Sequence, residues 1–157
     1  MIWEYKGEVF NPSLNPNYYG FVYKLIYTDK SGKEYSYIGK KSFKSISTLE
    51  ALKSGNKRNF HNRFYNKNVN GKRVTFEELE KESNWKSYEG SGKHIPKGLK
   101  LVSKEILKLC DTKIDLTYWE DYFLMVNEVL FDKNNFNYNV AGRYYAEKIT
   151  GSKPYIK

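Results

Sequence analysis

Two aromatic segments, at positions 20–27 and 35–41, constrain the fold more than any other part of the sequence. They read GFVYKLIY and YSYIGKK, and the residues between them, TDKSGKE, are typical of a turn. Strand-forming residues on both sides of a turn predict a β-hairpin with a loop of several residues. Tyr23 and Tyr37 can point to one face of this hairpin if the register allows it.

The elements after the hairpin predict an α+β domain. Capping-box spacing predicts short helices over 47–55 and 75–83. A further helix is expected near Pro96, and the apolar run at 99–110 is the third plausible strand. This order is typical of a small three-stranded antiparallel sheet flanked by helices.

The clearest helix is predicted over 115–131. Four apolar residues there repeat at intervals of three and four residues and would form a stripe toward the core: Trp119, Phe123, Val126 and Leu130. Glu120 lies beside this stripe. It is placed either to cap the helix with Thr117 or to hold a divalent ion over the sheet.

With 157 residues and 39% hydrophobic content, the chain is expected to form one domain, 1–157. We expect an N-terminal extension at 1–19, a basic insertion at 43–84 after the second strand, and a loose tail at 151–157. The single cysteine, Cys110, and two histidines exclude an internal disulfide and a Cys/His zinc finger. The sequence has no segment typical of a membrane span or signal peptide, which predicts a cytoplasmic protein.

A formal net charge of +9 favours an anionic partner, and nucleic acid is the first candidate. Residues 53–73 carry lysines and arginines without an acid, interleaved with aromatic residues. This stretch is either a DNA-contacting surface or a solvated loop. The candidate DNA-binding residues are Lys57, Arg58, Arg63, Lys67, Lys72 and Arg73.

The lysines that follow Tyr37 could change the acidity of the hairpin tyrosines. A free phenol, with a pKa of about 10, is a poor base at neutral pH, and a nearby ammonium group favours the phenolate. Lys40 and Lys41 follow Tyr37 by three and four residues. The alternative is an ordinary hairpin in which tyrosines pack and lysines end the strand.

Several motifs, in the same order along the chain, resemble the GIY-YIG nucleases. FVY and YIG at the hairpin match the family signature, and WKSYEGSGK, SKEILKLCDTKIDLTYWE and YNVAG resemble its later segments. The opening EYKGEVFNPSLNPNYYGFVYKL resembles the SegE-like branch of phage homing endonucleases. The resemblance spans nearly the whole chain.

This resemblance implies a nuclease that hydrolyses double-stranded DNA with one divalent cation, Mg²⁺ or another such as Mn²⁺. Glu120 would be the metal ligand. Tyr37, or a water that it orients, would be the general base, and Tyr23 would hydrogen-bond the scissile phosphate or the nucleophile. Lys40, with Lys41, would stabilise charge and tune the tyrosine.

Asn139 in YNVAG would order the site or contact phosphate. Many family members also carry an arginine and a histidine after the YIG tyrosine, and this chain has neither there. The resemblance places the missing cation at Lys93 first. Arg58, Arg63 and His61 of the insertion are the alternatives.

The sequence therefore predicts a metal-dependent DNA endonuclease of a phage or mobile element, acting as a monomer or a transient dimer on DNA. Two alternatives share the same fold. One is a DNA-binding module with weak or no catalysis, and the other is a restriction-type nuclease.

Overall fold

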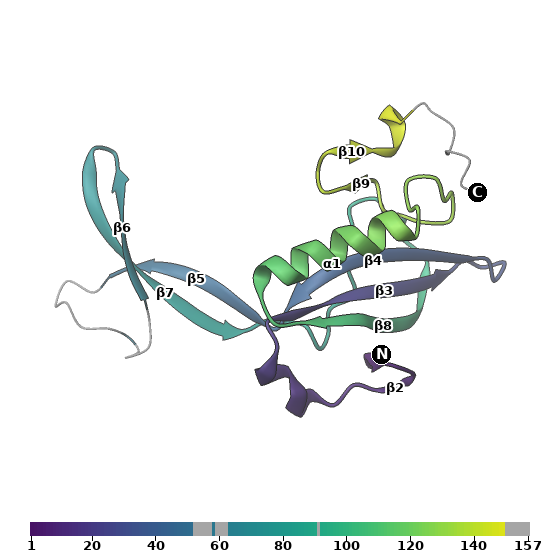
Figure 1. The fold of residues 1–157 in the computed structure, drawn as a ribbon, viewed down its shortest axis with the longest axis horizontal. Helices are drawn as coiled ribbons and strands as arrows, with labels where there is room; N and C mark the ends of the chain where they lie inside the picture. Colours follow the sequence, from purple (N-terminus) through teal and green to yellow (C-terminus); the bar gives the residue numbers. More distant parts are fainter. Residues whose placement is uncertain (52–57, 59–62, 91, 150–157) are drawn as a thin grey trace.

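The structure is a computed structural model that describes residues 1–51, 58, 63–90 and 92–149 (Figure 1). It is a mixed α+β fold with a five-stranded main sheet, ordered β2-β1-β8-β3-β4. The main-sheet strands are β1 (Glu4–Tyr5), β2 (Glu8–Val9), β3 (Gly20–Thr28), β4 (Glu34–Ser42) and β8 (Lys100–Cys110).

A second, three-stranded sheet extends away from the main sheet, and we call it the arm (Figure 1). Its strands, in the order β5-β7-β6, are β5 (Lys44–Glu50), β6 (Arg63–Val69) and β7 (Lys72–Glu82). The remaining elements are the 3-10 helices η1 (Pro12–Asn17) and η2 (Ala146–Lys148), the helix α1 (Lys113–Val126), and the paired strands β9 (Asn139–Val140) and β10 (Tyr144–Tyr145).

The predicted hairpin is confirmed. β3 and β4 pair antiparallel from Gly20↔Ser42 to Thr28↔Glu34, and the predicted third strand is β8, antiparallel to β3. The predicted number of three strands is wrong, because the extension at 1–19 adds β1, parallel to β8, and β2. Strands of two residues have no alternation that a sequence pattern can reveal.

The main sheet has a hydrophobic core on each face. One face of β3 packs Phe21, Tyr23 and Leu25 against Trp3 of the extension and Trp85 of the loop after the arm. The other face packs against α1. Cys110 lies in this second core and is 2% exposed, as a small core residue should be.

The two helices predicted in the insertion are wrong where the structure describes them, because 47–50 lie in β5 and 75–82 lie in β7. Positions 52–55 of the first predicted helix lie outside the described residues. β5 pairs with β7 along its whole length, from Lys44↔Glu82 to Glu50↔Phe76. Ser47 and Glu50 have helix-cap spacing, but the sheet ladder satisfies their backbone instead. Continuous pairing with neighbouring strands outweighs the helical preference of the glutamates in β7.

The predicted helix forms as α1, which begins two residues before the predicted start at 115 and ends at Val126 instead of 131. Its N-cap is Thr112, whose hydroxyl accepts the backbone N–H of Asp115 at 3.1 Å. The predicted stripe is partly wrong, because Val126 is 59% exposed while Leu116 and Leu124 are buried. At about 100° per residue these two leucines lie on either side of Glu120, so the buried face is rotated by about 90° around the helix axis from the predicted stripe.

The segment near Pro96 forms turns, so the helix expected there is wrong. The expected loose tail at 151–157, like Lys57 and His61, lies outside the described residues. No helix in the described ranges is long and apolar enough to cross a bilayer.

Candidate active site

β4 is the last strand of the main sheet on its side, and both of its edges are paired. β3 takes one edge, and the segment at 134–138 runs along the other. The Ser36 N–H donates to the carbonyl of Asn134 at 2.8 Å, and the Phe136 N–H donates to that of Ser36 at 2.9 Å. These bonds bring the YNVAG segment beside the strand that carries the YIG motif.

A cavity of about 330 Å³ lies at this edge of the sheet. Its lining joins residues of β4, α1 and the C-terminal segment: Tyr37, Lys40, Thr117, Glu120, Asp121, Leu124, Asn139, Ala141 and Gly142. Side chains from both faces of β4 reach it because no further main-sheet strand lies beyond. Four of the residues predicted from the sequence line this one cavity: Tyr37, Lys40, Glu120 and Asn139.

Tyr23 and Tyr37 lie on the same face of the hairpin, with ring centroids 6.3 Å apart. Tyr23 is 1% exposed, and its hydroxyl donates to that of Tyr88 at 3.5 Å. Gly39 is opposite Tyr23 in the register, and a Cβ there would lie 2.5 Å from the Tyr23 hydroxyl oxygen. The glycine of the YIG motif therefore makes room for the buried phenol.

Burial raises the pKa of Tyr37, and the nearby Tyr88 and Glu120 raise it further. The phenol therefore keeps its proton at neutral pH. The expectation that Lys40 lowers this pKa is wrong, because Lys40 is three residues from Tyr37 along a strand and lies on the opposite face.

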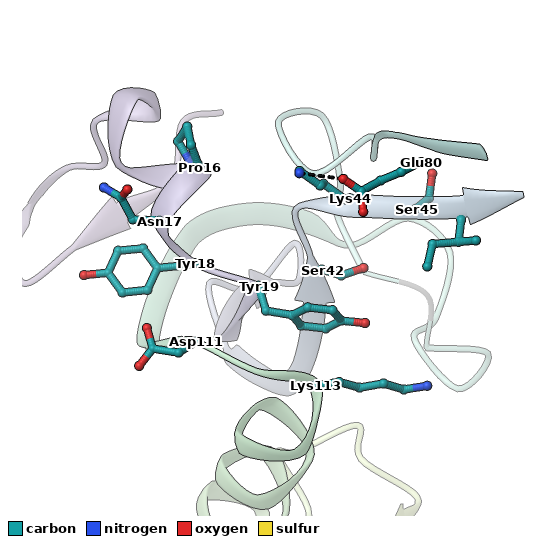
Figure 2. A pocket seen from close by; sticks show the side chains of 11 residues that line it. Pro16, Asn17, Tyr18, Tyr19, Ser42, Lys44, Ser45, Glu80, Asp111 and Lys113 are labelled. Carbon is teal, nitrogen blue, oxygen red and sulfur yellow. Dashed lines mark hydrogen bonds and ion pairs between the residues drawn. The ribbon is translucent and has the colours of Figure 1, made fainter. Parts of the chain in front are cut away.

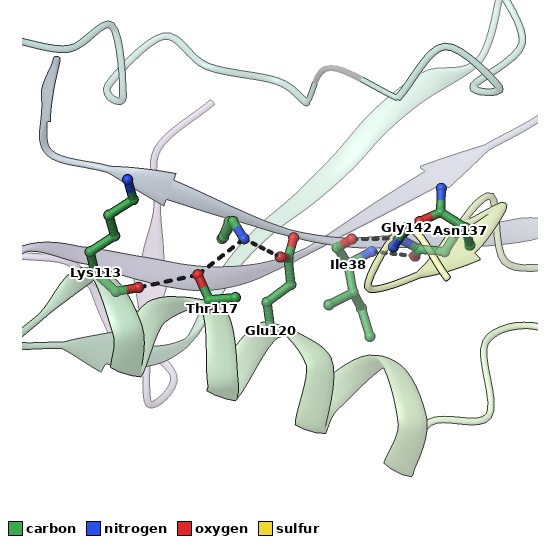
Figure 3. Close-up of polar contacts among 8 residues, drawn as sticks. Ile38, Lys113, Thr117, Glu120, Asn137 and Gly142 are labelled. Carbon is green, nitrogen blue, oxygen red and sulfur yellow. Dashed lines mark hydrogen bonds and ion pairs between the residues drawn. The ribbon is translucent and has the colours of Figure 1, made fainter. Parts of the chain in front are cut away.

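Glu120 forms an ion pair with Lys40, in which Oε2 of Glu120 lies 2.8 Å from Nζ of Lys40. The carboxylate comes from the buried face of α1, midway between Leu116 and Leu124, and its side chain is 20% exposed (Figure 3). Burial raises the pKa of Glu120, and the hydrogen bond from Lys40 opposes that shift. The alternative role as a helix cap is wrong, because α1 begins at Lys113.

Asn137 was not predicted from the sequence, although it makes two hydrogen bonds to β4. Its Oδ1 accepts the Ile38 N–H at 2.8 Å, and its Nδ2 donates to the Ile38 carbonyl at 2.6 Å (Figure 3). Asn139 accepts the Gly142 N–H at 3.0 Å and so orders the turn beside the cavity. A run of asparagines after a helix is the sequence signal for the Asn137 contact, whereas Asn139 belongs to the YNVAG motif.

Lys41 and Lys93 lie on the tyrosine side of β4. Lys41 donates to Oδ1 of Asn84 at 2.7 Å and sits 4.3 Å from the centre of the Tyr88 ring. Burial lowers its pKa. Lys93 is exposed, and it directly follows Gly92, where a Cβ would lie 3.0 Å from the Tyr37 ring.

The predicted DNA-binding residues that the structure describes belong to the arm and do not line the cavity. Arg58 is paired with the buried Glu77 at 2.6 Å, so its charge is already compensated. Arg63 and Lys67 are exposed on β6, and Lys72 and Arg73 are exposed on β7.

The donors at the cavity fit a hard divalent cation. Among the described residues no three His, Cys, Asp or Glu side chains form a cluster that could hold a metal ion. The cavity is instead lined by two carboxylates, Glu120 and Asp121, with a hydroxyl and an amide nearby. Mg²⁺ is commonly held by one or two carboxylates, with water and substrate phosphate as its other ligands.

A second cavity, of about 480 Å³, lies where the arm joins the main sheet (Figure 2). It is lined by two lysines, Lys44 and Lys113, and two carboxylates, Glu80 and Asp111, and Lys44 is paired with Glu80 at 2.6 Å. It contains none of the predicted catalytic residues, so the smaller cavity is the candidate active site.

Comparison with known proteins gives one family. The family model described as endonuclease segE, GIY-YIG domain, matches residues 3–149. No curated protein matches the sequence, and neither does any solved structure.

Gly39→Ala should destabilise the protein by about 1–3 kcal/mol, because the new methyl group overlaps the buried Tyr23 hydroxyl. Urea unfolding measures the change. The same substitution in a Tyr23→Ala background should cost much less, since the overlap is gone. Equal costs in the two backgrounds would contradict the proposed packing.

Asn137→Leu should cost about 1–3 kcal/mol, because it leaves the N–H and carbonyl of Ile38 without their partner. Amide exchange at Ile38, measured by NMR, should speed up. The matched control is Asn134→Ala, since Asn134 accepts from Ser36 through its backbone carbonyl and its side chain is exposed. Unchanged exchange at Ile38 in Asn137→Leu would show that the contact does not hold β4.

Proposed function

The chain belongs to the segE branch of the GIY-YIG endonucleases, and on this basis we propose that it hydrolyses phosphodiester bonds of double-stranded DNA with one divalent cation, Mg²⁺ or Mn²⁺. The observation that carries this proposal is the shared cavity. Tyr37, Lys40, Glu120 and Asn139 come from three separate elements, and all of them line it.

Glu120 would hold the cation, and Asp121, which lines the same cavity, would assist through a bound water. A bound divalent cation supplies positive charge to the phosphate and lowers the pKa of a coordinated water. Lys40 keeps a second positive charge at the cavity wall, where it would stabilise the charge that develops on the phosphate oxygens.

Tyr37 would act as a hydrogen-bond donor that orients water or phosphate, and not as a phenolate base. Its raised pKa supports this choice between the two roles, because a phenol that keeps its proton can donate a hydrogen bond but cannot act as a base. Tyr23 would be a positioning residue, since it is 1% exposed and meets Tyr37 only through ring packing.

Asn139 would order the turn at 139–142 beside the phosphate, as its bond to Gly142 suggests. Lys93 and Lys41 would supply the positive charge that an arginine side chain supplies in other family members. Lys93 is exposed and follows the glycine that packs on Tyr37, whereas Lys41 is partly buried against Tyr88.

One active site per chain would cut one strand, so a double-strand break would require a second, transiently associated copy. The relation to segE favours a homing-type enzyme of a phage or mobile element over a restriction enzyme. A binding module without catalysis is the outcome to expect if the wild type binds DNA but leaves it intact.

Glu120→Gln should abolish cleavage of a supercoiled plasmid in Mg²⁺, with a loss of about a hundredfold or more, while binding to DNA in EDTA persists. The matched control is Glu105→Gln, because Glu105 is an exposed carboxylate on β8 of the main sheet. Full cleavage by Glu120→Gln would overturn the assignment of the metal ligand.

Tyr37→Phe should slow cleavage by about 10²–10³-fold, because a preorganised hydrogen-bond donor is lost. The ratio of wild-type to variant rates should stay constant between about pH 7 and 9, since the phenol is protonated throughout this range. A phenolate base would instead make this ratio rise about tenfold with each pH unit. Single-turnover rates across that range decide between the two roles.

A further inference from the structure

The arm extends away from the main sheet and contributes little to the core (Figure 1). Among its described strand residues only Glu77 is buried, and this carboxylate is paired with Arg58 within the arm. The far end of the arm therefore does not stabilise the rest of the domain, and its exposed side chains are available to a partner.

The end of the arm is a two-stranded β-ribbon. Within the part of the chain that the structure describes, β5 reaches only as far as Phe76 in the register and Ala51 adds one hydrogen bond to the Thr75 carbonyl. Residues 66–74, which we call the ribbon, pair β6 with β7. Asn70 and Gly71 form the turn, with φ of 50° and 78°, values that favour a tight two-residue hairpin. The Tyr65 and Phe76 rings stack at 5.6 Å at its base and stiffen it.

Charge is separated along the arm. Residues 63–76 contain four basic residues and no acid, whereas residues 77–82 contain four glutamates and one lysine. The acids near the base meet cations of their own: Lys44 with Glu80 at 2.6 Å, Lys86 with Glu82 at 3.0 Å and Arg58 with Glu77 at 2.6 Å. In the described part of the chain, no ion pair involves the ribbon cations Lys67, Lys72 and Arg73.

The register divides the ribbon into two faces with different chemistry. Asn68 is directly opposite Arg73 on one face, and both are exposed. Lys67 and Lys72 lie on the other face, since Lys72 pairs with Val69 two residues beyond Lys67. Asparagine and arginine side chains match the major-groove edges of adenine and guanine, whereas lysine suits phosphate.

We propose that the ribbon enters the major groove of duplex DNA, where Asn68 and Arg73 select the base sequence and Lys67 and Lys72 bind the flanking phosphates. A two-stranded β-ribbon fits the width of this groove. The proposal rests on the proposed function for its substrate, and it adds the surface that would give the nuclease its sequence preference.

The length of the arm predicts how far the bases that the ribbon contacts lie from the cleaved phosphate. β7 has 11 residues, and at about 3.3 Å per residue it spans roughly 33 Å. This is about one turn of B-DNA, or about 10 base pairs. The recognised bases should therefore lie on the order of one helical turn from the cleaved phosphate.

The test is selection of bound sequences from a pool of randomised DNA duplexes in EDTA, so that binding is measured without cleavage. The wild type is compared with Asn68→Ala/Arg73→Ala and with Lys67→Gln/Lys72→Gln. Lys30→Gln/Lys33→Gln is the matched control, because these lysines lie in the exposed turn of the β3–β4 hairpin. Thermal unfolding verifies that each variant folds as the wild type does.

The wild type and the control should enrich the same short sequence. Asn68→Ala/Arg73→Ala should lose preference at discrete positions and still bind DNA. Lys67→Gln/Lys72→Gln should keep the preference, bind all sequences more weakly, and lower the slope of log affinity against log salt by about 2.

An unchanged preference in Asn68→Ala/Arg73→Ala, or no enriched sequence with the wild type, would overturn the proposal for the ribbon. Plasmid cleavage in Mg²⁺ tests the nuclease function separately. A wild type that cleaves while Asn68→Ala/Arg73→Ala keeps its sequence preference would refute the ribbon proposal alone. Selective binding without cleavage by the wild type would refute the nuclease proposal alone.

Discussion

The candidate site depends on the pairing of β4 along both of its edges. β3 fixes one edge through a regular antiparallel ladder, and Asn137 fixes the other by bonding both backbone groups of Ile38. Every side chain of the strand then has a defined direction, with Tyr37 toward one core and Lys40 toward α1. The same pairing carries Asn139 to the cavity, so one strand organises groups that are distant in the sequence.

The two faces of β4 give their side chains different electrostatic environments. On one side, burial among tyrosines keeps the phenol of Tyr37 neutral. On the other, the half-buried Glu120 remains close to the ammonium group of Lys40. A neutral donor beside a carboxylate and a lysine suits the hydrolysis of a phosphodiester, which needs fixed donors and positive charge more than a strong protein base.

The sequence alone was sufficient to predict the helices and strands that have a strong local pattern of apolar residues. The β3–β4 hairpin, β8 and α1 were predictable. The arm itself was not, because Ser47, Glu50 and the glutamates of β7 favour a helix locally and only sheet pairing reverses that preference. The gathering of four predicted residues at one cavity was anticipated through motif resemblance, whereas the neutral Tyr37 and the Asn137 contact depend on burial and long-range geometry that no spacing reveals.

Anomalous diffraction from crystals of the Tyr37→Phe protein, grown with duplex DNA and Mn²⁺, tests the central claim most directly. We expect one manganese peak about 2.1 Å from a Glu120 carboxylate oxygen, with a DNA phosphate as a further ligand. A bound duplex whose manganese lies away from Glu120, or whose backbone does not approach the cavity at the edge of β4, would contradict the assignment of this cavity as the active site.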